Sequence, residues 1–224
     1  MATGGSVARI LPTLLILAQP GFATEHLYRD PVTGTVVEWR GTDLDGRCGA
    51  TDHLQRALTF IDAHHRTFLL RHPRRELALS RQSRDDLGHT RLRFAQTYRH
   101  LPVWGAELSV HFDAQDCLIR LAGRYAPTPR NLGLEPAIDA ATARRVAGCG
   151  AARACQETLV VYPAKGGAAH LVYQVEVTAS LASRQVLVDA VSGGVVVTIP
   201  RVYDGAGSPT PGPIPVPPPP AKFP

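Results

Sequence analysis

The residues best suited to metal binding or nucleophilic chemistry in this 224-residue chain are nine histidines and four cysteines. No histidine is followed by glutamate, so the His-Glu-x-x-His pattern, which sets two zinc ligands and a general base on one helix, is absent. The Gly-x-Ser-x-Gly turn that exposes a nucleophilic serine and the glycine loops that cradle phosphates are also absent from the sequence. His64 and His65 are adjacent, about 100° apart on a helix, which does not suit a shared metal. Asp85 and Asp86 lie together in a polar loop and are expected to be solvent-exposed charges. The sequence therefore predicts no catalytic residue, no metal site and no cofactor.

The N-terminus has the pattern of a secretory signal peptide. Arg9 precedes an apolar run from Ile10 to Ala18, and small residues around Ala23 suit cleavage. This run is well short of the roughly 20 residues that a membrane-spanning helix needs. An N-terminal anchor and a wrongly assigned start codon are the alternatives. We expect residues 1–23 to be removed and the mature protein to be secreted or periplasmic, with no membrane attachment after cleavage.

Cysteines in an exported chain predict disulfides rather than a reduced metal site. Cys149 and Cys155 are close enough in sequence to close a local loop, and Cys48 and Cys117 would then form a long-range pair. Four cysteines allow three connectivities, and the sequence does not choose among them, although this pairing is favoured. Neither spacing resembles the paired Cys-x-x-Cys of a structural zinc site.

Hydrophobic periodicity predicts a helix followed by antiparallel strands, and then the same succession again. This is the pattern of an α+β fold made of two small units, each with one helix packed on an antiparallel sheet. The expected helices cover residues 51–70, begun by Thr51 or Asp52 and limited by Pro73, and residues 139–147. The expected strands cover residues 90–98, 107–112, 118–124, 158–162, 171–177, 184–189 and 194–199.

Proline and glycine mark the limits of these units. The stretch 127–136 is rich in both and is expected to be a linker. The tail, residues 205–224, holds nine of the 19 prolines and favours extended polyproline, so we expect it to be disordered. It would serve as a spacer or, alternatively, recruit a domain that reads polyproline.

Arginine dominates the positive charge of the chain. The formal net charge is +5, and only two of the 24 basic residues are lysines. Because arginine forms bidentate pairs with carboxylates, the excess could favour an acidic protein partner, with an ordinary solvated surface as the alternative. The basic residues are scattered rather than gathered in a stripe with aromatic residues, so nucleic-acid binding is not expected.

Two stretches resemble parts of a known family. The region His89–Gly123 contains Tyr98, Leu101-Pro102-Val103, Trp104-Gly105, Val110, Asp113 and Gly123, and it resembles the fungalysin/thermolysin propeptide (FTP) motif. The family's usual glycine before Leu101 is His100 here, which could alter the turn. The stretches 171–175 and 186–195 resemble the PepSY-like half of the same propeptides.

The resemblance implies a cystatin-like and PepSY-like propeptide architecture, with an FTP-type unit over residues 24–126 and a PepSY-like unit over 137–204. Propeptides of this kind act as intramolecular chaperones and temporary inhibitors of the thermolysin-like (M4 family) zinc metallopeptidase that they precede. The expected role is therefore non-enzymatic binding of such a peptidase, in trans or formerly in cis. A truncated precursor without its catalytic domain, and an extracellular binding or scaffold module with another partner, are the alternatives.

The resemblance also implies two partner-binding segments. The first consists of Tyr98, Leu101, Pro102, Val103, Trp104 and Gly105. The second is the segment that in the family runs towards the peptidase active site, here Arg201, Val202, Tyr203 and Asp204. For Val103 and Trp104 the alternative is purely structural, namely packing against the helix expected over 51–70.

Overall fold

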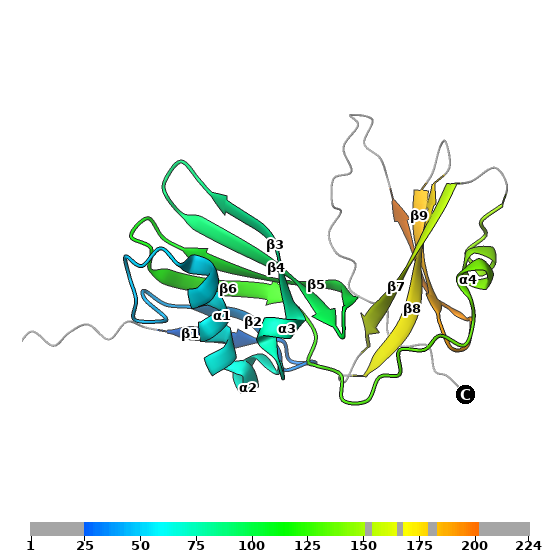
Figure 1. The fold of residues 1–224 in the computed structure, drawn as a ribbon, viewed down its shortest axis with the longest axis horizontal. Coiled ribbons are helices and arrows are strands. Elements are labelled where there is room, and N and C mark those ends of the chain that lie inside the picture. Colours follow the sequence, from blue (N-terminus) through cyan, green and yellow to red (C-terminus); the bar gives the residue numbers. More distant parts are fainter. Residues whose placement is uncertain (1–24, 151–153, 165–167, 179–182, 202–224) are drawn as a thin grey trace, which may run out of the picture.

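The computed structural model describes residues 25–150, 154–164, 168–178 and 183–201, and it shows an α+β chain with few helices and a large sheet (Figure 1). The expected signal peptide, the tail 205–224 and the segment Val202–Asp204 lie outside the described residues. The helices are α1 (His53–Ala63), α2 (His65–Phe68), α3 (Pro73–Glu76) and α4 (Ala140–Val146). The strands are β1 (His26–Arg29), β2 (Val36–Arg40), β3 (Leu77–Arg84), β4 (Thr90–Tyr98), β5 (Leu101–Phe112), β6 (Leu118–Arg124), β7 (Ala154–Pro163), β8 (Ala169–Thr178), β9 (Ser183–Asp189) and β10 (Val195–Arg201).

The strands form two antiparallel groups that meet at β5. In the first sheet the order is β1-β2-β6-β5-β4-β3. In the second sheet the order is β7-β8-β9-β10. A single parallel pairing, Val103 with Val161, connects β5 to β7. All ten strands are therefore connected, with a branch at β5, which pairs with β4, β6 and β7, and the two antiparallel sheets lie side by side (Figure 1).

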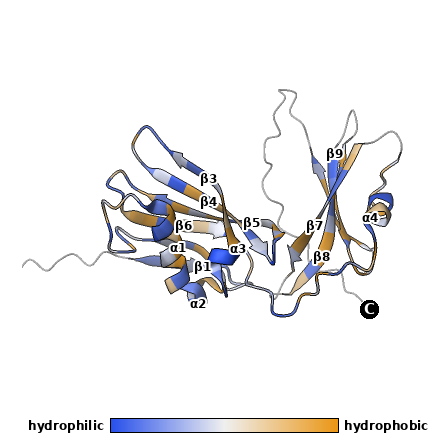
Figure 2. Ribbon diagram, in the orientation of Figure 1, coloured by the Kyte–Doolittle hydropathy of each residue, from blue (hydrophilic) through white to orange (hydrophobic). Residues whose placement is uncertain are grey.

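One face of the first sheet is covered by helices. Strand β4 alternates buried and more exposed residues along its length, as expected for a sheet with one covered face. Its buried side, with Leu92 and Phe94, joins the same apolar cluster as Phe60 and Ile61 of α1. Figure 2 shows hydrophobic colour alternating with hydrophilic colour along these strands. This cluster is the main core of the protein.

The second sheet has apolar residues on both faces. On one face, Ala143 and Ala147 of the α4 region pack with Val175 of β8 and Val186 of β9. On the other face, a smaller cluster contains Val160, Tyr162, Val172 and Leu187. Helix α4 begins after Asp139, whose side chain accepts a hydrogen bond from the backbone N–H of Thr142 at 2.7 Å, a normal N-terminal cap.

The two disulfides of the structure join the cysteines in the pairing that the sequence analysis favoured. Cys48 is bonded to Cys117, which ties the segment before α1 to the turn between β5 and β6. Cys149 is bonded to Cys155, which ties the segment after α4 to the start of β7. Both predicted pairings are confirmed.

Several predicted elements need correction. The helix expected over 51–70 is broken at His64, and Leu69, within the expected range, has a left-handed backbone and is 38% exposed. Asp52 occupies the N-cap position without a side-chain hydrogen bond. The strand expected from residue 107 begins at Leu101, and β1, β2 and β3 had no counterpart among the predicted strands. Strands β4 and β6 have the predicted bounds.

Among the described residues, no helix is long and apolar enough to cross a membrane. No group of three histidine, cysteine or acidic side chains converges in the described ranges to hold a metal ion.

Candidate functional site

A two-residue turn begins the first predicted partner-binding segment. Tyr98 of β4 pairs with Leu101 of β5, leaving Arg99 and His100 as the loop. Their φ angles are 47° and 75°, and positive φ at both loop residues is the pattern of the type I′ hairpin turn. His100 thus takes the left-handed conformation that glycine adopts at least cost. The turn remains tight although the family's glycine is missing.

Strand β5 leaves its partner directly after this turn. Pro102 lies opposite Thr97 of β4, whereas Glu107 lies opposite Ala95. Four residues of β5, 103–106, consequently face a single residue of β4. Such a bulge bends a strand and redirects its side chains. Here the bend carries β5 from the first sheet to the second, because the parallel bond to β7 is formed within it.

The side chains of this bulge pack in two directions. Val103 is 4% exposed and belongs to the main core with α1. Trp104 is half-buried and packs on the small cluster of the second sheet, 5.5 Å from the Tyr162 ring between centroids. Its indole N–H donates to Gln185 Oε1 at 3.3 Å. The structural alternative was thus right for Val103 and wrong for Trp104, which bridges to β9.

Two further residues complete the junction. Leu101 is half-buried and contacts both the main core and the α4-side cluster of the second sheet. Gly105 has φ 64°, a left-handed conformation that permits the sharp change of direction in β5. Pro102 is exposed on the surface of the bulge. Tyr98 is 6% exposed and lies within the main core.

A buried glutamine that the sequence analysis missed fixes the chain after β6. Gln96 is 1% exposed, and its side-chain amide donates to the carbonyl of Ala126 at 2.8 Å. The backbone N–H of Ala126 donates in return to Gln96 Oε1 at 2.9 Å. These two hydrogen bonds hold the chain that follows β6 beside the bulge of β5. The only sign of this role in the sequence was a polar residue between Phe94 and Tyr98 on the buried face of β4.

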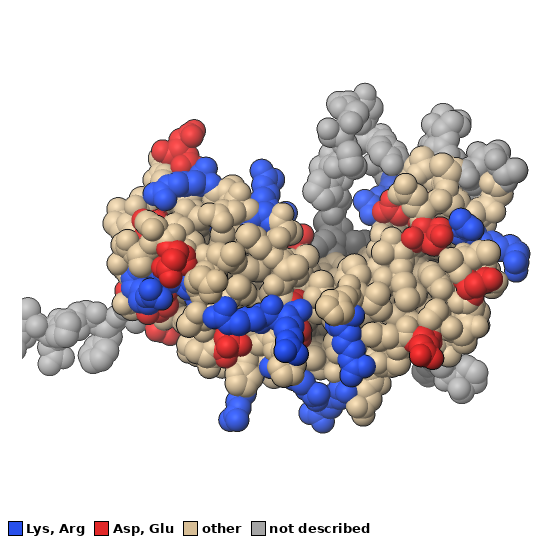
Figure 3. All heavy atoms as spheres, viewed as in Figure 1, with Lys and Arg blue, Asp and Glu red and all other residues tan. Residues whose placement is uncertain are grey.

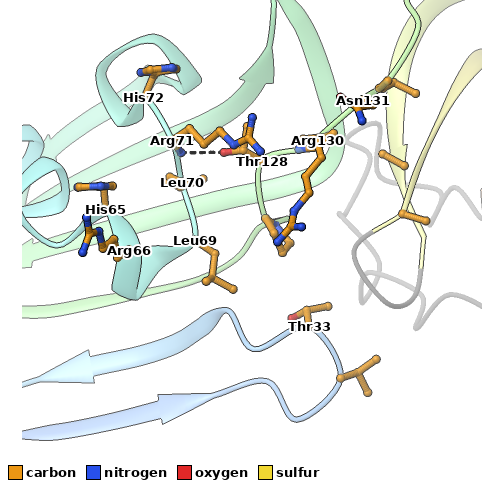
Figure 4. Close-up of a pocket in the computed structure, with 16 residues that line it drawn as sticks. Thr33, His65, Arg66, Leu69, Leu70, Arg71, His72, Thr128, Arg130 and Asn131 are labelled. Atoms are coloured by element: carbon orange, nitrogen blue, oxygen red, sulfur yellow. Dashed lines mark hydrogen bonds between the residues drawn. The ribbon is translucent and has the colours of Figure 1, made fainter.

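Residues 127–132 form one wall of an open groove of about 1140 Å³ (Figure 4). Leu69, Leu70 and Arg71 lie on the facing wall, and Arg71 N–H donates to Thr128 Oγ1 at 2.9 Å. Thr128 in turn donates to the buried carboxylate of Glu76 at 2.6 Å. The charged lining is entirely basic and consists of Arg66, Arg71 and Arg130, with His65 and His72 beside them. Figure 3 shows basic side chains gathered over this part of the surface.

The second predicted segment begins at the end of β10. Arg201 is the last described residue before 202, and its guanidinium lies 3.7 Å from Glu176 Oε1. Among the described residues, strand β10 pairs with β9 alone, and no described strand pairs with its outer edge. Val196 and Val197 of β10 pack on the same cluster as Trp104. The structure therefore places the bulge and β10 against one apolar cluster.

Comparison with known proteins identifies the region around this junction. Residues 75–125 match the model of the Fungalysin/Thermolysin Propeptide Motif. Thermolysins from Alicyclobacillus acidocaldarius subsp. acidocaldarius and from Bacillus caldolyticus are each 35% identical over 132 residues, which is 53% of this chain and 24% of the relative. The chain thus spans about a quarter of the length of these curated relatives.

Among solved structures, the Bacillus megaterium YpeB C-terminal domain aligns with 80% of this chain and 90% of its own, at 13% identity and a TM-score of 0.38. The stretch Tyr98–Gly105 lies inside the region that matches the family model. This chain contains a fungalysin/thermolysin propeptide motif, and the motif holds the turn and the bulge that join its two sheets.

Proposed function

We propose that this chain is an exported, non-enzymatic protein that binds a thermolysin-like zinc metallopeptidase as its inhibitor, its folding chaperone or both. The propeptide motif over residues 75–125 is the observation that carries this proposal. Propeptides with this motif inhibit and help to fold the peptidase that they precede. The identity of 35% with thermolysins over 132 residues supports the same partner class.

The geometry of the motif divides its residues between two tasks. Tyr98 and Val103 are buried in the main core, so their contribution to binding is indirect, through the shape of the bulge. Trp104 is held by the second sheet. Among the predicted contact residues of this segment, Pro102 and Gly105 are exposed and can touch a partner directly. We therefore assign direct contact to the outer surface of the bulge.

The open edge of β10 supplies a second surface for the partner. A strand edge offers unpaired backbone N–H and C=O groups, which can bind an extended segment by strand addition. The chain that leaves this edge at Arg201 is the part that in the family runs towards the peptidase cleft. In our proposal, Arg201 and residues 202–204 carry inhibition, while the sheets template or hold the peptidase.

Two truncations test this assignment with a matched control. Purified protein lacking residues 201–224 is expected to lose inhibition of a co-secreted thermolysin-like peptidase, measured as residual cleavage of a fluorogenic peptide. Protein lacking only residues 205–224 keeps Arg201 and residues 202–204 and is expected to inhibit as the full chain does. Equal inhibition by both truncations would contradict the role of this segment.

Chaperone activity needs a separate measurement. The full chain is added to denatured peptidase, and the recovery of activity is followed after the chain has been digested away. We expect faster recovery than in buffer or with an unrelated basic protein. Absence of binding, inhibition and assisted refolding for every co-secreted metallopeptidase would overturn the proposed function in favour of another partner class.

A further inference from the structure

The face of the first sheet that the helices leave uncovered carries an unusual set of charges. Strand side chains alternate between faces, so the residues between the core positions of β2, β4, β5 and β6 share this second face. We call it the open face. It contains Glu38, Arg40, Arg91, Arg93, Glu107, Ser109, His111, Arg120 and Arg124.

Basic residues occupy one cross-strand row of the open face. Arg91 of β4 lies opposite His111 of β5, His111 lies opposite Arg120 of β6, and Arg120 lies opposite Arg40 of β2. Neighbouring strands are about 4.8 Å apart, so this row is about 14 Å long. Like charges placed directly opposite one another destabilise a sheet, so the row lowers stability unless something neutralises it.

The acidic residues of the open face neutralise only part of this charge. Glu38 pairs with Arg120 at 2.6 Å, and Glu107 pairs with Arg93 at 3.6 Å. The remaining three arginines form no ion pair with any described residue. Five arginines minus two glutamates leave a formal charge of +3 on the open face. The three unpaired arginines are Arg40, Arg91 and Arg124.

A shallow hollow lies in the middle of this face. Its volume is about 350 Å³, and small residues form part of its lining, namely Ser109, Ala122 and Gly123. Ser109 is 7% exposed and accepts a hydrogen bond from Arg91 at 3.3 Å, which holds that guanidinium over the hollow. A side chain at position 123 would clash, because its Cβ would lie 2.2 Å from the Glu107 carbonyl oxygen. The hollow thus has a floor without bulky groups and a rim of arginines.

We propose that the open face binds an acidic, extended polypeptide segment of a partner protein, with its carboxylates pairing with Arg40, Arg91 and Arg124. Four or five extended residues, at about 3.3 Å each, match the length of the row. Arginine holds carboxylates through two parallel hydrogen bonds, which suits such a segment. The open face would bind this segment whether or not its bearer is a metallopeptidase.

The composition of the face favours a peptide over a nucleic acid. Binding of single strands uses aromatic side chains on which bases stack, and the open face as defined above carries only the His111 ring. Tyr28 of β1 lies opposite Glu38 on the same side of the sheet, but the Arg40 guanidinium already lies 5.7 Å from the centre of its ring. Glu38 and Glu107 would also repel a phosphate backbone, whereas a polypeptide can match them with a donor. The same two glutamates work against a uniformly anionic lipid surface.

The test uses the full chain and a fluorescein-labelled decaglutamate peptide at 50 mM NaCl. We expect saturable binding by fluorescence anisotropy, and amide shifts of the 15N-labelled chain confined to β2, β4, β5 and β6. The double variant Arg40→Gln, Arg91→Gln should bind at least tenfold more weakly. The control double variant Arg66→Gln, Arg145→Gln removes the same charge from other surfaces and should change affinity less than twofold.

Different results are expected if the peptide binds another surface of the chain, or if the open face binds another anionic ligand. Raising NaCl to 300 mM should weaken binding strongly, because exposed charges are screened. Equal affinity of the two double variants, or amide shifts in the groove or the second sheet instead, would overturn the proposal. Binding of a decathymidine strand or of phosphatidylglycerol vesicles without binding of the peptide would overturn it too. Failure here leaves the truncation assay on peptidase inhibition unaffected, so the two proposals fail independently.

Discussion

The two sheets of this protein bury their apolar residues in different ways. The first sheet covers one face with α1 to α3 and leaves the other face polar and basic. The second sheet has apolar clusters on both faces, with α4 over one and Trp104 of β5 against the other. The core of the first sheet comes almost wholly from its own strands and helices, with Val161 of β7 added at its border, whereas one face of the second sheet is covered by Trp104 from its neighbour. The bulge in the propeptide motif is what makes this dependence possible.

The largest expected effect on stability comes from a buried ion pair in the part of the chain that contains the first sheet. Arg56 of α1 is 1% exposed, and its guanidinium pairs with Asp45 at 2.8 Å and donates to the carbonyl of Asp116 at 2.7 Å. Burial raises the pKa of Asp45, but the bonds and charge of Arg56 outweigh it and leave the pKa below its usual value. Arg56→Ala would leave Asp45 uncompensated, so we expect a loss of about 3–5 kcal/mol in unfolding free energy by urea denaturation.

The control for Arg56 is an exposed ion pair on the same helix layer. Arg74 lies 3.9 Å from Asp62, and both side chains are about half exposed. Arg74→Ala should cost less than about 1 kcal/mol. If the two substitutions cost the same, the buried pair contributes no more to stability than a surface pair.

Removal of the disulfides should affect the two regions unequally. Cys48 and Cys117 are separated by 69 positions, whereas Cys149 and Cys155 are separated by six. Loop entropy then predicts a loss of about 4 kcal/mol for the double alanine variant of the first bond and about 2 kcal/mol for the second. Thermal unfolding of both variants measures the difference. Equal losses would indicate that residual structure in the unfolded chain, rather than loop length, sets the contribution.

The bulge is tested by comparing the two tryptophans. Trp104→Ala should cost about 2 kcal/mol, less than a fully buried tryptophan, and should speed amide exchange in β9 and β10. Trp39 is 9% exposed and packs on Phe60, so Trp39→Ala should instead speed exchange in β2 and α1. Uniformly faster exchange in both variants would show that the sheets unfold as one cooperative unit.

The smallest effect is a dependence on pH at the open face. Burial, followed by the charges of Arg91 and Arg120, lowers the pKa of His111 from its usual value of about 6.5 to about 4. The unfolded chain therefore binds a proton at this residue in the window between pH 6.5 and pH 4 that the folded chain does not bind. Stability is lost as the pH falls through this window.

Replacing His111 with glutamine should reduce that loss. The difference in melting temperature between pH 7 and pH 4.5 should be smaller in His111→Gln than in the unaltered protein. His26→Gln, at an exposed position whose histidine forms no ion pair with a described residue, serves as the matched control. An unchanged difference in the His111 variant would mean that the acid sensitivity arises elsewhere in the fold.

Much of the fold could be predicted because it rests on local periodicity. The alternation in residues 90–98 gave the bounds of β4, since a strand with one covered face shows period two. Asp139 marked the start of α4 through a cap that depends on neighbouring residues only. Strand β3 escaped prediction because all its residues after Leu77 are exposed, which removes the alternation (Figure 2).

The sequence by itself determined the α+β class and the location of the propeptide motif, because these depend on residue type and on short spacings. The tertiary structure decided what the motif does in the fold. It set the bulge opposite Gln96, sent Trp104 to the second sheet and aligned Arg91, His111, Arg120 and Arg40 in one row. Cross-strand register and packing between distant segments are set by contacts that no local pattern encodes, since each joins residues far apart in the chain.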